Sequence, residues 1–168
     1  MTDASKDPVI DPGDFRHVLG HFPTGVTVVT TDGEPGAGRP AGVTIGSFTS
    51  ISLDPPLVGF YLGSGAGTRD VVELAGHFCV NILADDQQEL SNRMASKADD
   101  KFEGITYELS ETGSPILPDV LGIIDCRIHQ VVEAGDHDLI IGRVLNLSVR
   151  REGRPLLFFK GQYGSFAT

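Results

Sequence analysis

Hydrophobic and polar positions alternate in short stretches over much of this chain, a period that is typical of β-strands. Residues 26–31 are β-branched throughout and predict a buried strand. Apolar and polar side chains alternate along residues 124–133 and again along residues 139–149, with the turn 134–137 between them. The pattern therefore predicts a long antiparallel hairpin in the C-terminal third, followed by a last strand at residues 155–160.

The segment 42–60 is the stretch around which the rest of the chain is organised. Residues 44–52 carry hydroxyl side chains separated by small or apolar residues, and residues 57–62 form an apolar run. Because prolines fix the backbone between them, we predict a strand, a turn at Asp54-Pro55-Pro56 and a second strand. The hydroxyls and glycines would suit a polar, flat or phosphorylated ligand. Serine and threonine are also common on exposed strand faces, so an ordinary barrel strand is the alternative.

The first predicted helix begins at Asp11, which is a favourable cap followed by Pro12 at the first helical position. Its apolar residues recur at helical spacing, and Pro23 is expected to end it. One face should therefore pack on the core through Phe15, Val18, Leu19 and Phe22.

Two further helices are expected. Thr68 can cap a short helix at residues 69–75, after the glycine-rich loop 63–68. The amides at that helix start would suit a phosphate, although a plain turn fits the same spacing. Another helix is expected to begin at Asp85, with Leu90 and Met94 four residues apart on its buried side.

The six or seven expected strands with few helices predict a mainly β domain built as a closed, mostly antiparallel barrel. We expect a flexible arm at residues 1–12 and one domain at residues 13–168, since 168 residues can bury a single core. The net charge of -10 argues against nucleic acid and anionic membranes as partners. No apolar run approaches the length of a membrane-spanning helix, and a cytoplasmic protein is expected.

Candidate catalytic groups are scarce. Cys79 and Cys126 lie in apolar strand patterns and are expected to be buried free thiols, and the cysteines and histidines have no zinc-binding spacing. Hydroxyls, glycines and turn amides are abundant, which favours a protein whose cofactor performs the chemistry. His137, in a turn between two strands, is the exception: either an inert turn residue or a contact to a nicotinamide or phosphate group.

The order and spacing of several motifs together resemble the flavin reductase-like family, from about Phe15 to Phe166. The motifs are Phe22-Pro23-Thr24-Gly25-Val26, Gly42-Val43-Thr44 with Ser47-Phe48-Thr49-Ser50, Ser52-Leu53-Asp54-Pro55-Pro56-Leu57-Val58, Phe78-Cys79-Val80-Asn81-Ile82-Leu83, Lys101-Phe102 and Gly135-Asp136-His137. The resemblance implies an FMN-binding split β-barrel, antiparallel and Greek-key-like, with a few flanking helices.

The resemblance also implies an NAD(P)H:flavin oxidoreductase. Hydride passes from NADH or NADPH to FMN or FAD, and the reduced flavin diffuses to a separate oxygenase, as in two-component flavin-dependent monooxygenases. A homodimer with one flavin per subunit near the dimer interface is implied as well. The sequence shows no basic cluster for a 2′-phosphate, which favours NADH, and leaves the choice between FMN and FAD open.

Carried over by position, the resemblance places the flavin ring and ribityl chain against Val43, Thr44, Ile45, Gly46 and Ser47. Ser64 and Thr68 would face the phosphate side, and Asn81 would lie in the strand beside the flavin. No side chain is expected to be catalytic, because hydride transfer itself needs no protein acid.

The loop that covers the phosphate or adenosine end would contain Ser96, Lys101 and Phe102, and His137 would lie on the nicotinamide side. Gly46 departs from relatives that carry a side chain at this point, so a backbone amide would have to replace that contact. Whether flavin is a held cofactor or a passing substrate depends on this difference.

Three alternatives stay open at this point. The chain could be a non-catalytic flavin-binding split-barrel module that acts as a sensor or store. It could be an interaction protein with a vestigial pocket. A pyridoxamine-phosphate oxidase has a related fold, but no cluster of Arg and Lys at a phosphate site supports it.

Overall fold

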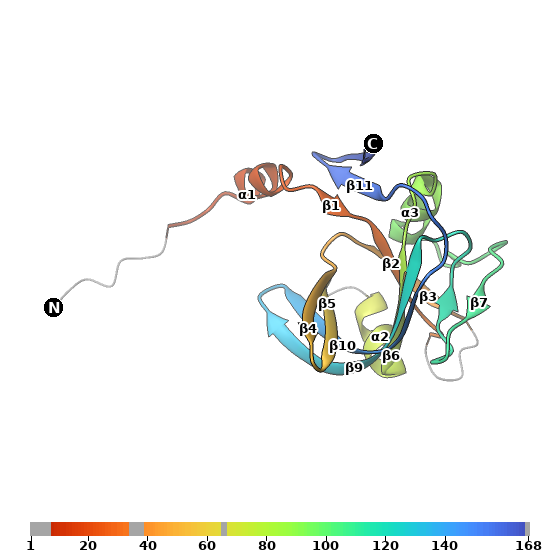
Figure 1. Ribbon diagram of the computed structural model, residues 1–168. Helices are drawn as coiled ribbons and strands as arrows, with labels where there is room; N and C mark the ends of the chain where they lie inside the picture. The colour runs from red at the N-terminus through yellow and green to blue at the C-terminus, as the bar shows by residue number, and fades with distance from the viewer. Residues whose placement is uncertain (1–7, 34–38, 65–66, 167–168) are drawn as a thin grey trace.

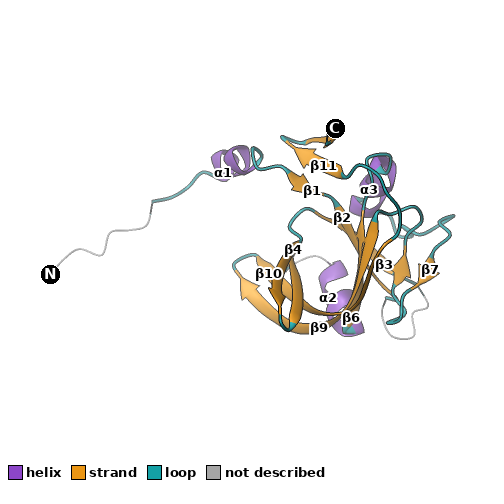
Figure 2. Cartoon of the chain, viewed as in Figure 1, coloured by secondary structure: helices purple, strands orange, loops and turns teal. Residues whose placement is uncertain are grey.

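The structure is a computed structural model that describes residues 8–33, 39–64 and 67–166, and it is mainly β (Figure 1, Figure 2). The helices in this part of the chain are α1 (Pro12–Leu19), α2 (Gly67–Ala75) and α3 (Gln88–Ala95). The strands are β1 (Thr24–Gly25), β2 (Thr27–Thr31), β3 (Ala41–Ile45), β4 (Thr49–Leu53), β5 (Pro56–Gly63), β6 (His77–Ile82), β7 (Glu108–Leu109), β8 (Pro115–Ile116), β9 (Gly122–Ala134), β10 (His137–Val149), β11 (Leu156–Phe159) and β12 (Gln162–Ser165).

Seven strands form one antiparallel sheet in the order β3-β2-β6-β9-β10-β5-β4. The sheet curls so that α2 lies in its hollow, and β1, β11 and β12 form a separate three-stranded sheet beside it (Figure 1). The predicted split barrel with flanking helices is therefore confirmed. The predicted long hairpin is confirmed too, because β9 and β10 pair from Ala134 and His137 to Gly122 and Val149.

The prediction of one strand over residues 44–52 is wrong. β3 ends at Ile45 and β4 begins at Thr49, and these two strands lie at opposite edges of the seven-stranded sheet. Residues 46–48, called the edge corner below, carry the chain from one edge to the other. The hydroxyl pattern concealed this break because serine suits turns as well as exposed strand faces.

Two apolar clusters pack on the two faces of this sheet. The cluster inside the barrel includes Phe60, Phe78 and Ile140, and Val72 of α2 packs into it. The second cluster lies on the other face and includes Met94 of α3 and Leu156 of β11. The barrel is therefore filled by side chains, and a ligand must bind outside it.

Helix α1 begins as predicted but does not pack as predicted. The Asp11 carboxylate accepts hydrogen bonds from the N–H groups of Gly13 and Asp14 at 2.7 and 3.1 Å. The helix ends at Leu19, before Pro23, and none of its residues is buried. Its apolar face is exposed because the helix stands beside the barrel rather than on it (Figure 1).

Helix α3 begins at Gln88, so the prediction of a start at Asp85 is wrong. The Asp85 carboxylate instead pairs with Arg154 at 2.8 Å and accepts a hydrogen bond from the Ser165 hydroxyl at 3.0 Å. The helical spacing itself is confirmed, because Met94 is fully buried. Among the described residues, no helix combines the length and apolar character needed to cross a membrane.

The two cysteines are buried free thiols, as predicted. Cys79 pairs with Asp125 and Cys126 pairs with Phe78, so the two thiols are in neighbouring strands but point to opposite faces of the sheet. Burial, with a smaller effect from the charge of Asp125, raises the pKa of Cys126 to about 12. The same causes raise the pKa of Cys79 well above its ordinary value. Neither thiol is therefore activated as a nucleophile.

Candidate functional site

The edge corner is fixed to β5 by Ser47. The Ser47 hydroxyl accepts a hydrogen bond from the backbone N–H of Tyr61 at 3.0 Å and lies 3.4 Å from the Tyr61 carbonyl, to which it donates. On its other side the corner meets β1, since a Cβ at Gly46 would lie 3.0 Å from the Thr24 hydroxyl oxygen. The corner therefore joins β1, β3 and β5.

His137 lies close to this contact, on the neighbouring strand β10. Tyr61 of β5 pairs with Leu139, and Gly63 pairs with His137. With a rise of about 3.3 Å per residue, the two pairs are about 7 Å apart. The neighbours of Tyr61 point into the barrel, so Tyr61 and Gly63 share its outer face. The structure thus brings the predicted ring-binding corner and the predicted nicotinamide-side histidine together on one face.

The imidazole of His137 is oriented by its neighbour in the turn. Nδ1 of His137 lies 2.7 Å from the Asp136 carboxylate. This hydrogen bond is the main cause that holds the pKa of Asp136 below its ordinary value. Nε2 lies 4.0 Å from the point where a Cβ on Gly63 would stand. The glycine leaves space beside Nε2, which is the nitrogen that a ligand can reach.

Helix α3 and the loop after it hold the edge strand β3. The Thr44 hydroxyl donates a hydrogen bond to the Ser91 carbonyl at 2.7 Å. The Lys101 ammonium donates to the carbonyls of Gly42 and Met94 at 3.0 and 2.8 Å. Its partial burial lowers the pKa of Lys101. Both predicted residues, Thr44 and Lys101, therefore position β3.

Phe102 packs beneath the same strand. A Cβ at Gly42 would lie 2.9 Å from Sδ of Met94 and 3.2 Å from the Phe102 ring, so only glycine allows this packing. The Phe102 ring is buried and meets Tyr107 edge to face, with ring centroids 5.6 Å apart. Ser96 is exposed at the end of α3, where its hydroxyl donates to the Arg93 carbonyl at 2.7 Å. Phe102 is thus part of the support under β3.

Three predicted residues direct their side chains into the core. Ile45 is buried and Val43 is partly buried against the barrel cluster, so only their backbone can reach a ligand. Asn81 is fully buried, and its side-chain amide donates to the Val28 carbonyl at 3.2 Å. Its side-chain carbonyl accepts from the Leu117 N–H at 2.8 Å. Asn81 therefore ties strands together, and we assign it to the core.

The predicted phosphate loop meets an acidic cavity. The Ser64 N–H donates to the Asp136 carbonyl at 3.0 Å, which holds Ser64 beside the His137 turn. A cavity of about 520 Å³ here is lined by Ser64, Arg69, Glu73, Val131, Glu133, Gly135 and Asp138. The Arg69 guanidinium on the cavity wall is already paired with Asp138 and Glu73, so the local charge disfavours a phosphate. The Thr68 side chain and residues 65–66 lie outside the described residues.

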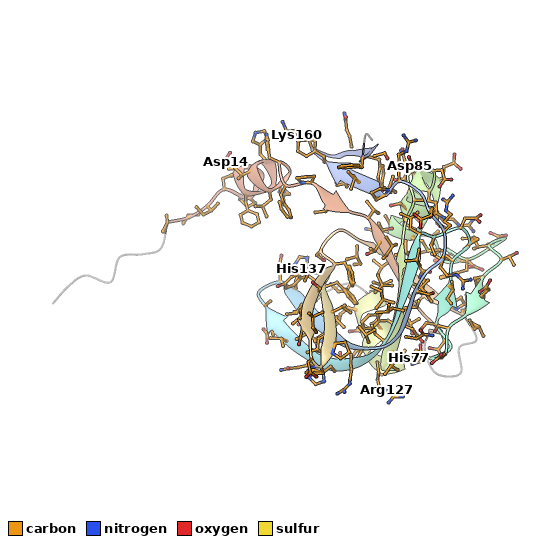
Figure 3. The ribbon with its side chains drawn as sticks, in the orientation of Figure 1. Asp14, His77, Asp85, Arg127, His137 and Lys160 are labelled. Atoms are coloured by element: carbon orange, nitrogen blue, oxygen red, sulfur yellow. The ribbon has the colours of Figure 1, made fainter. Side chains whose placement is uncertain are left out.

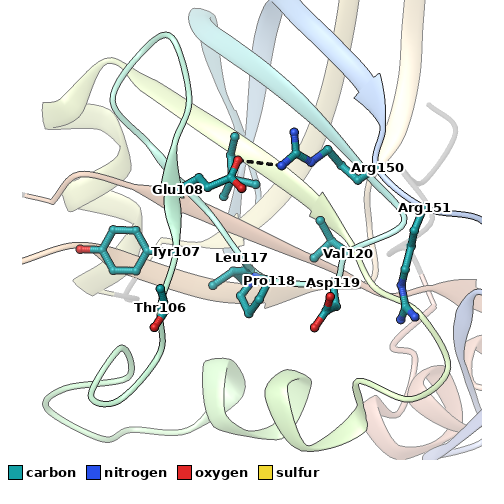
Figure 4. Close-up of a pocket in the computed structure, with 10 residues that line it drawn as sticks. Thr106, Tyr107, Glu108, Leu117, Pro118, Asp119, Val120, Arg150 and Arg151 are labelled. Carbon is teal, nitrogen blue, oxygen red and sulfur yellow. Dashed lines mark hydrogen bonds and ion pairs between the residues drawn. The ribbon is translucent and has the colours of Figure 1, made fainter.

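A second cavity, of about 370 Å³, lies between the β7–β8 hairpin and the segment after β10 (Figure 4). Arg150 donates to the Glu108 carboxylate at 2.7 Å on its wall, and residues 116–120 form the other side. None of the residues predicted to bind flavin lines this cavity. It is therefore a separate feature from the edge corner.

Thr24, Gly25 and Tyr61 adjoin the edge corner and were not predicted as site residues. Gly25 is exposed and has open space where a Cβ would stand, and Tyr61 is 42% exposed. A signal existed for two of them, because Thr24-Gly25 is part of a motif that carries the family resemblance. Tyr61 lies in an apolar run and gives no such signal.

The corner fits a flavin by its shape and its donors. Gly25 is exposed and has open space at its Cβ position, so a planar ring can approach its backbone closely, whereas the Cβ position of Gly46 is directed at the Thr24 hydroxyl. β3 is an edge strand, so its outer amide and carbonyl groups are not used by another strand of the sheet. Neutral dipoles of this kind can hold the polar edge of an isoalloxazine ring without any charged side chain.

Comparison with known proteins identifies the family. Residues 19–167 match the flavin reductase like domain. A flavin reductase of Pseudomonas putida is 49% identical over 94% of this chain and 92% of its own length. The FMN reductase (NADH) SmoA of Agrobacterium fabrum is 39% identical over 91% of this chain and 85% of its own.

A solved structure supports the same conclusion. Nitrilotriacetate monooxygenase component B from Mycobacterium thermoresistibile superposes with a TM-score of 0.87 at 44% identity, over 92% of this chain and 86% of that one. The chain therefore belongs to the flavin reductase like domain family, and the enzyme class predicted from its sequence, an NAD(P)H-dependent flavin reductase, is confirmed.

Proposed function

We propose that this protein transfers hydride from NADH to FMN or FAD and releases the reduced flavin to a separate oxygenase. The observation that carries the proposal is the position of the edge corner and His137 on one outer face, joined through β5. A bound flavin there would supply the hydride-accepting atom, and a nicotinamide could approach it from the histidine side. The name of the relative SmoA supports NADH and FMN as substrates.

In this proposal the residues of the chain bind and orient the flavin ring and stabilise the negative charge that develops on it. The outer amides of β3 and the corner amides near Gly46 and Ser47 donate to the polar edge of the ring. Donors aimed at developing negative charge stabilise the reduced state, and each charge-assisted hydrogen bond contributes about 1.5–3 kcal/mol. The contacts of Thr44, Lys101 and Phe102 keep β3 in place, so that these donors are already oriented when the ligand arrives.

A separate oxygenase partner is proposed because the solved structure with the TM-score of 0.87 is a component of a monooxygenase. Gly25 and Tyr61 beside the edge corner are exposed, which suits a flavin that arrives and leaves. A cytoplasmic location is part of the same proposal.

We also propose that the protein is a homodimer. Phe15, Val18 and Phe22 are 55%, 65% and 73% exposed, and the helix that carries two of them has no buried residue. An isolated helix of this length is marginal in water, so it needs a covering surface. A second copy of the chain can supply that covering surface, because it is always present at the same concentration. Helix α1 also leads directly into β1, which lies beside the edge corner.

The test is to mix the purified protein with FMN or FAD and NADH and to follow nicotinamide absorbance under air. Catalytic loss of NADH that depends on both flavin and protein supports the reductase. Tight flavin binding without turnover would instead identify a non-catalytic binding module, and absence of both would exclude either function.

A further inference from the structure

Side chains that are far apart in the sequence surround one cavity of about 470 Å³ between α1 and the β11–β12 turn. Four of them are basic or ionisable, and the remaining lining residues are glycines. The lining consists of Gly13, Arg16, His17, Gly20, His21, Lys160 and Gly161.

Hydrogen bonds hold these elements in place. The backbone N–H of Lys160 donates to the Gly20 carbonyl at 2.9 Å, which ties the β11–β12 turn to the end of α1. Nδ1 of His21 lies 2.9 Å from the His17 carbonyl, so it must donate to that oxygen. The His21 side chain is exposed and lines the cavity. The cavity is thus formed by the fold rather than by chance side-chain positions.

The charge of this cavity is opposite to that of the whole protein. The chain has a net charge of -10, yet none of the acidic residues that the structure describes lines the cavity. Within the described residues, neither Arg16 nor Lys160 forms an ion pair. The Asp11 carboxylate on the same helix is engaged by the helix N-terminus. Cationic groups without acidic partners attract an anion.

The backbone of Lys160 gives a second reason to expect a role for its side chain. Lys160 has φ 50° and Gly161 has φ 77°, and together they form the two-residue turn between the paired residues Phe159 and Gln162. Such turns favour asparagine or glycine, because other side chains are strained at positive φ. The ammonium of this strained lysine lies 5.3 Å from the centroid of the Phe159 ring, and the same side chain lines the cavity beside the other basic groups.

The cavity lies close to the edge corner. His21 is three residues before Thr24, a separation of at most about 11 Å. The Thr24 hydroxyl in turn meets Gly46 of the corner. Figure 3 shows Lys160 over the end of α1, on the side of the barrel that carries His137. A ligand with its ring at the corner can therefore reach this cavity with its phosphate end.

We propose that this cavity binds the phosphate groups of a nucleotide whose ring lies at the edge corner. The inference rests on the proposed function for the identity of that nucleotide, which is either the flavin or the nicotinamide substrate. It replaces the loop 63–68 as the phosphate site, because the described end of that loop adjoins three carboxylates.

The test compares binding of riboflavin, FMN, FAD, NADH, NADPH and inorganic pyrophosphate to three variants of the full chain by calorimetry. Lys160→Asn removes the charge and suits the strained turn, so this variant should fold at least as well as the wild type. Arg16→Gln removes the second charge. Arg127→Gln is the charge-matched control, because Arg127 lies on β9 at the far end of the barrel (Figure 3).

If the flavin supplies the phosphate, both cavity variants should bind FMN and FAD about tenfold more weakly than the wild type and should bind riboflavin with unchanged affinity. If the nicotinamide nucleotide supplies the phosphate, the affinity for NADH or NADPH should fall by the same factor. Pyrophosphate should bind the wild type and lose affinity in both variants. The inference is overturned if Lys160→Asn and Arg16→Gln change the affinity for pyrophosphate and for every phosphorylated nucleotide no more than Arg127→Gln does. Intact pyrophosphate binding without riboflavin binding would overturn only the proposed function.

Discussion

The Ser47 hydroxyl oxygen lies 3.0 Å from the backbone nitrogen of Tyr61 and accepts its hydrogen bond. This contact joins the corner between two opposite edge strands to β5, whose next outward-facing residue pairs with His137. One serine hydroxyl therefore sets the distance between the proposed flavin surface and the proposed nicotinamide side.

Ser47→Ala should loosen the corner. The substitution leaves the Tyr61 N–H without its protein partner and should cost about 1 kcal/mol of stability. A loss of that size lowers Tm by about 2–4 °C in a domain of this length. Flavin affinity should fall together with Tm, as measured by differential scanning calorimetry and fluorescence titration. Unchanged affinity in a variant with lowered Tm would show that the corner does not hold the ring.

Gly46→Ala tests the same surface from the side of β1. The new Cβ would lie 3.0 Å from the Thr24 hydroxyl oxygen, so one of the two must shift. We expect weaker flavin binding in Gly46→Ala and partial recovery in Gly46→Ala with Thr24→Ala, because the second change removes the hydroxyl. A double-mutant cycle of flavin dissociation constants measures this coupling. Additive losses would mean that Gly46 contacts the flavin independently of Thr24.

The fold was largely predictable because its main signals are local. β-branched residues gave the buried strand at residues 26–31, and period-two alternation gave the β9–β10 hairpin. The break between β3 and β4 was not predictable, since Gly46-Ser47-Phe48 is compatible with either a strand or a corner. Only the pairing of the two strands with different neighbours distinguishes these possibilities.

The site was predictable only where the family resemblance supplied it. The local sequence of Asn81 does not reveal that its amide is used by Val28 and Leu117, which are distant along the chain. Lys101 appears in the sequence as a loop cation, yet its ammonium binds the carbonyls of Gly42 and Met94. Long-range contacts of this kind require the fold before they can be seen.

His137→Ala should raise the KM for NADH severalfold and leave the flavin dissociation constant nearly unchanged. The reason is that the imidazole stands on the far side of Tyr61 from the corner, next to the space left by Gly63. Steady-state kinetics and a flavin titration measure the two constants separately. His129→Ala, an exposed histidine on β9, is the matched control. A selective loss of flavin affinity would place His137 on the flavin side instead.

The buried cysteines predict how stability depends on pH. Their pKa values are higher in the folded protein than in the unfolded chain, so the stabilising effect is complete below the unfolded thiol pKa, near 8.5. It is lost progressively as pH rises from there toward about 12, the folded pKa of Cys126. Each pH unit above the unfolded value costs about 1.4 kcal/mol per thiol.

Urea unfolding at pH 7.5 and pH 10 measures this loss. The variant Cys79→Ala with Cys126→Ala should lose less stability between the two pH values than the wild type, even though its stability at pH 7.5 is lower. An equal loss in both proteins would show that the thiols do not cause the alkaline destabilisation.

The proposed dimer depends on the exposed face of α1. Phe15→Asp places a charge on that face and should shift the protein toward monomers, because a buried unpaired carboxylate is costly. Analytical ultracentrifugation gives the mass, which should fall from twice 17.9 kDa toward 17.9 kDa. Leu109→Asp, at a residue of β7 that is 64% exposed, is the control and should not change the mass. A monomeric wild type would contradict the dimer directly.

The most direct test of the flavin position is an NMR titration of the ¹⁵N-labelled protein with FMN. We predict that the largest changes in amide chemical shift occur at Thr44–Ser47, Gly25 and Tyr61, and that NADH analogues then shift the amides around His137. If the largest changes instead fall on residues 106–108 and 116–120, around the cavity of Figure 4, the flavin binds elsewhere and the account is contradicted.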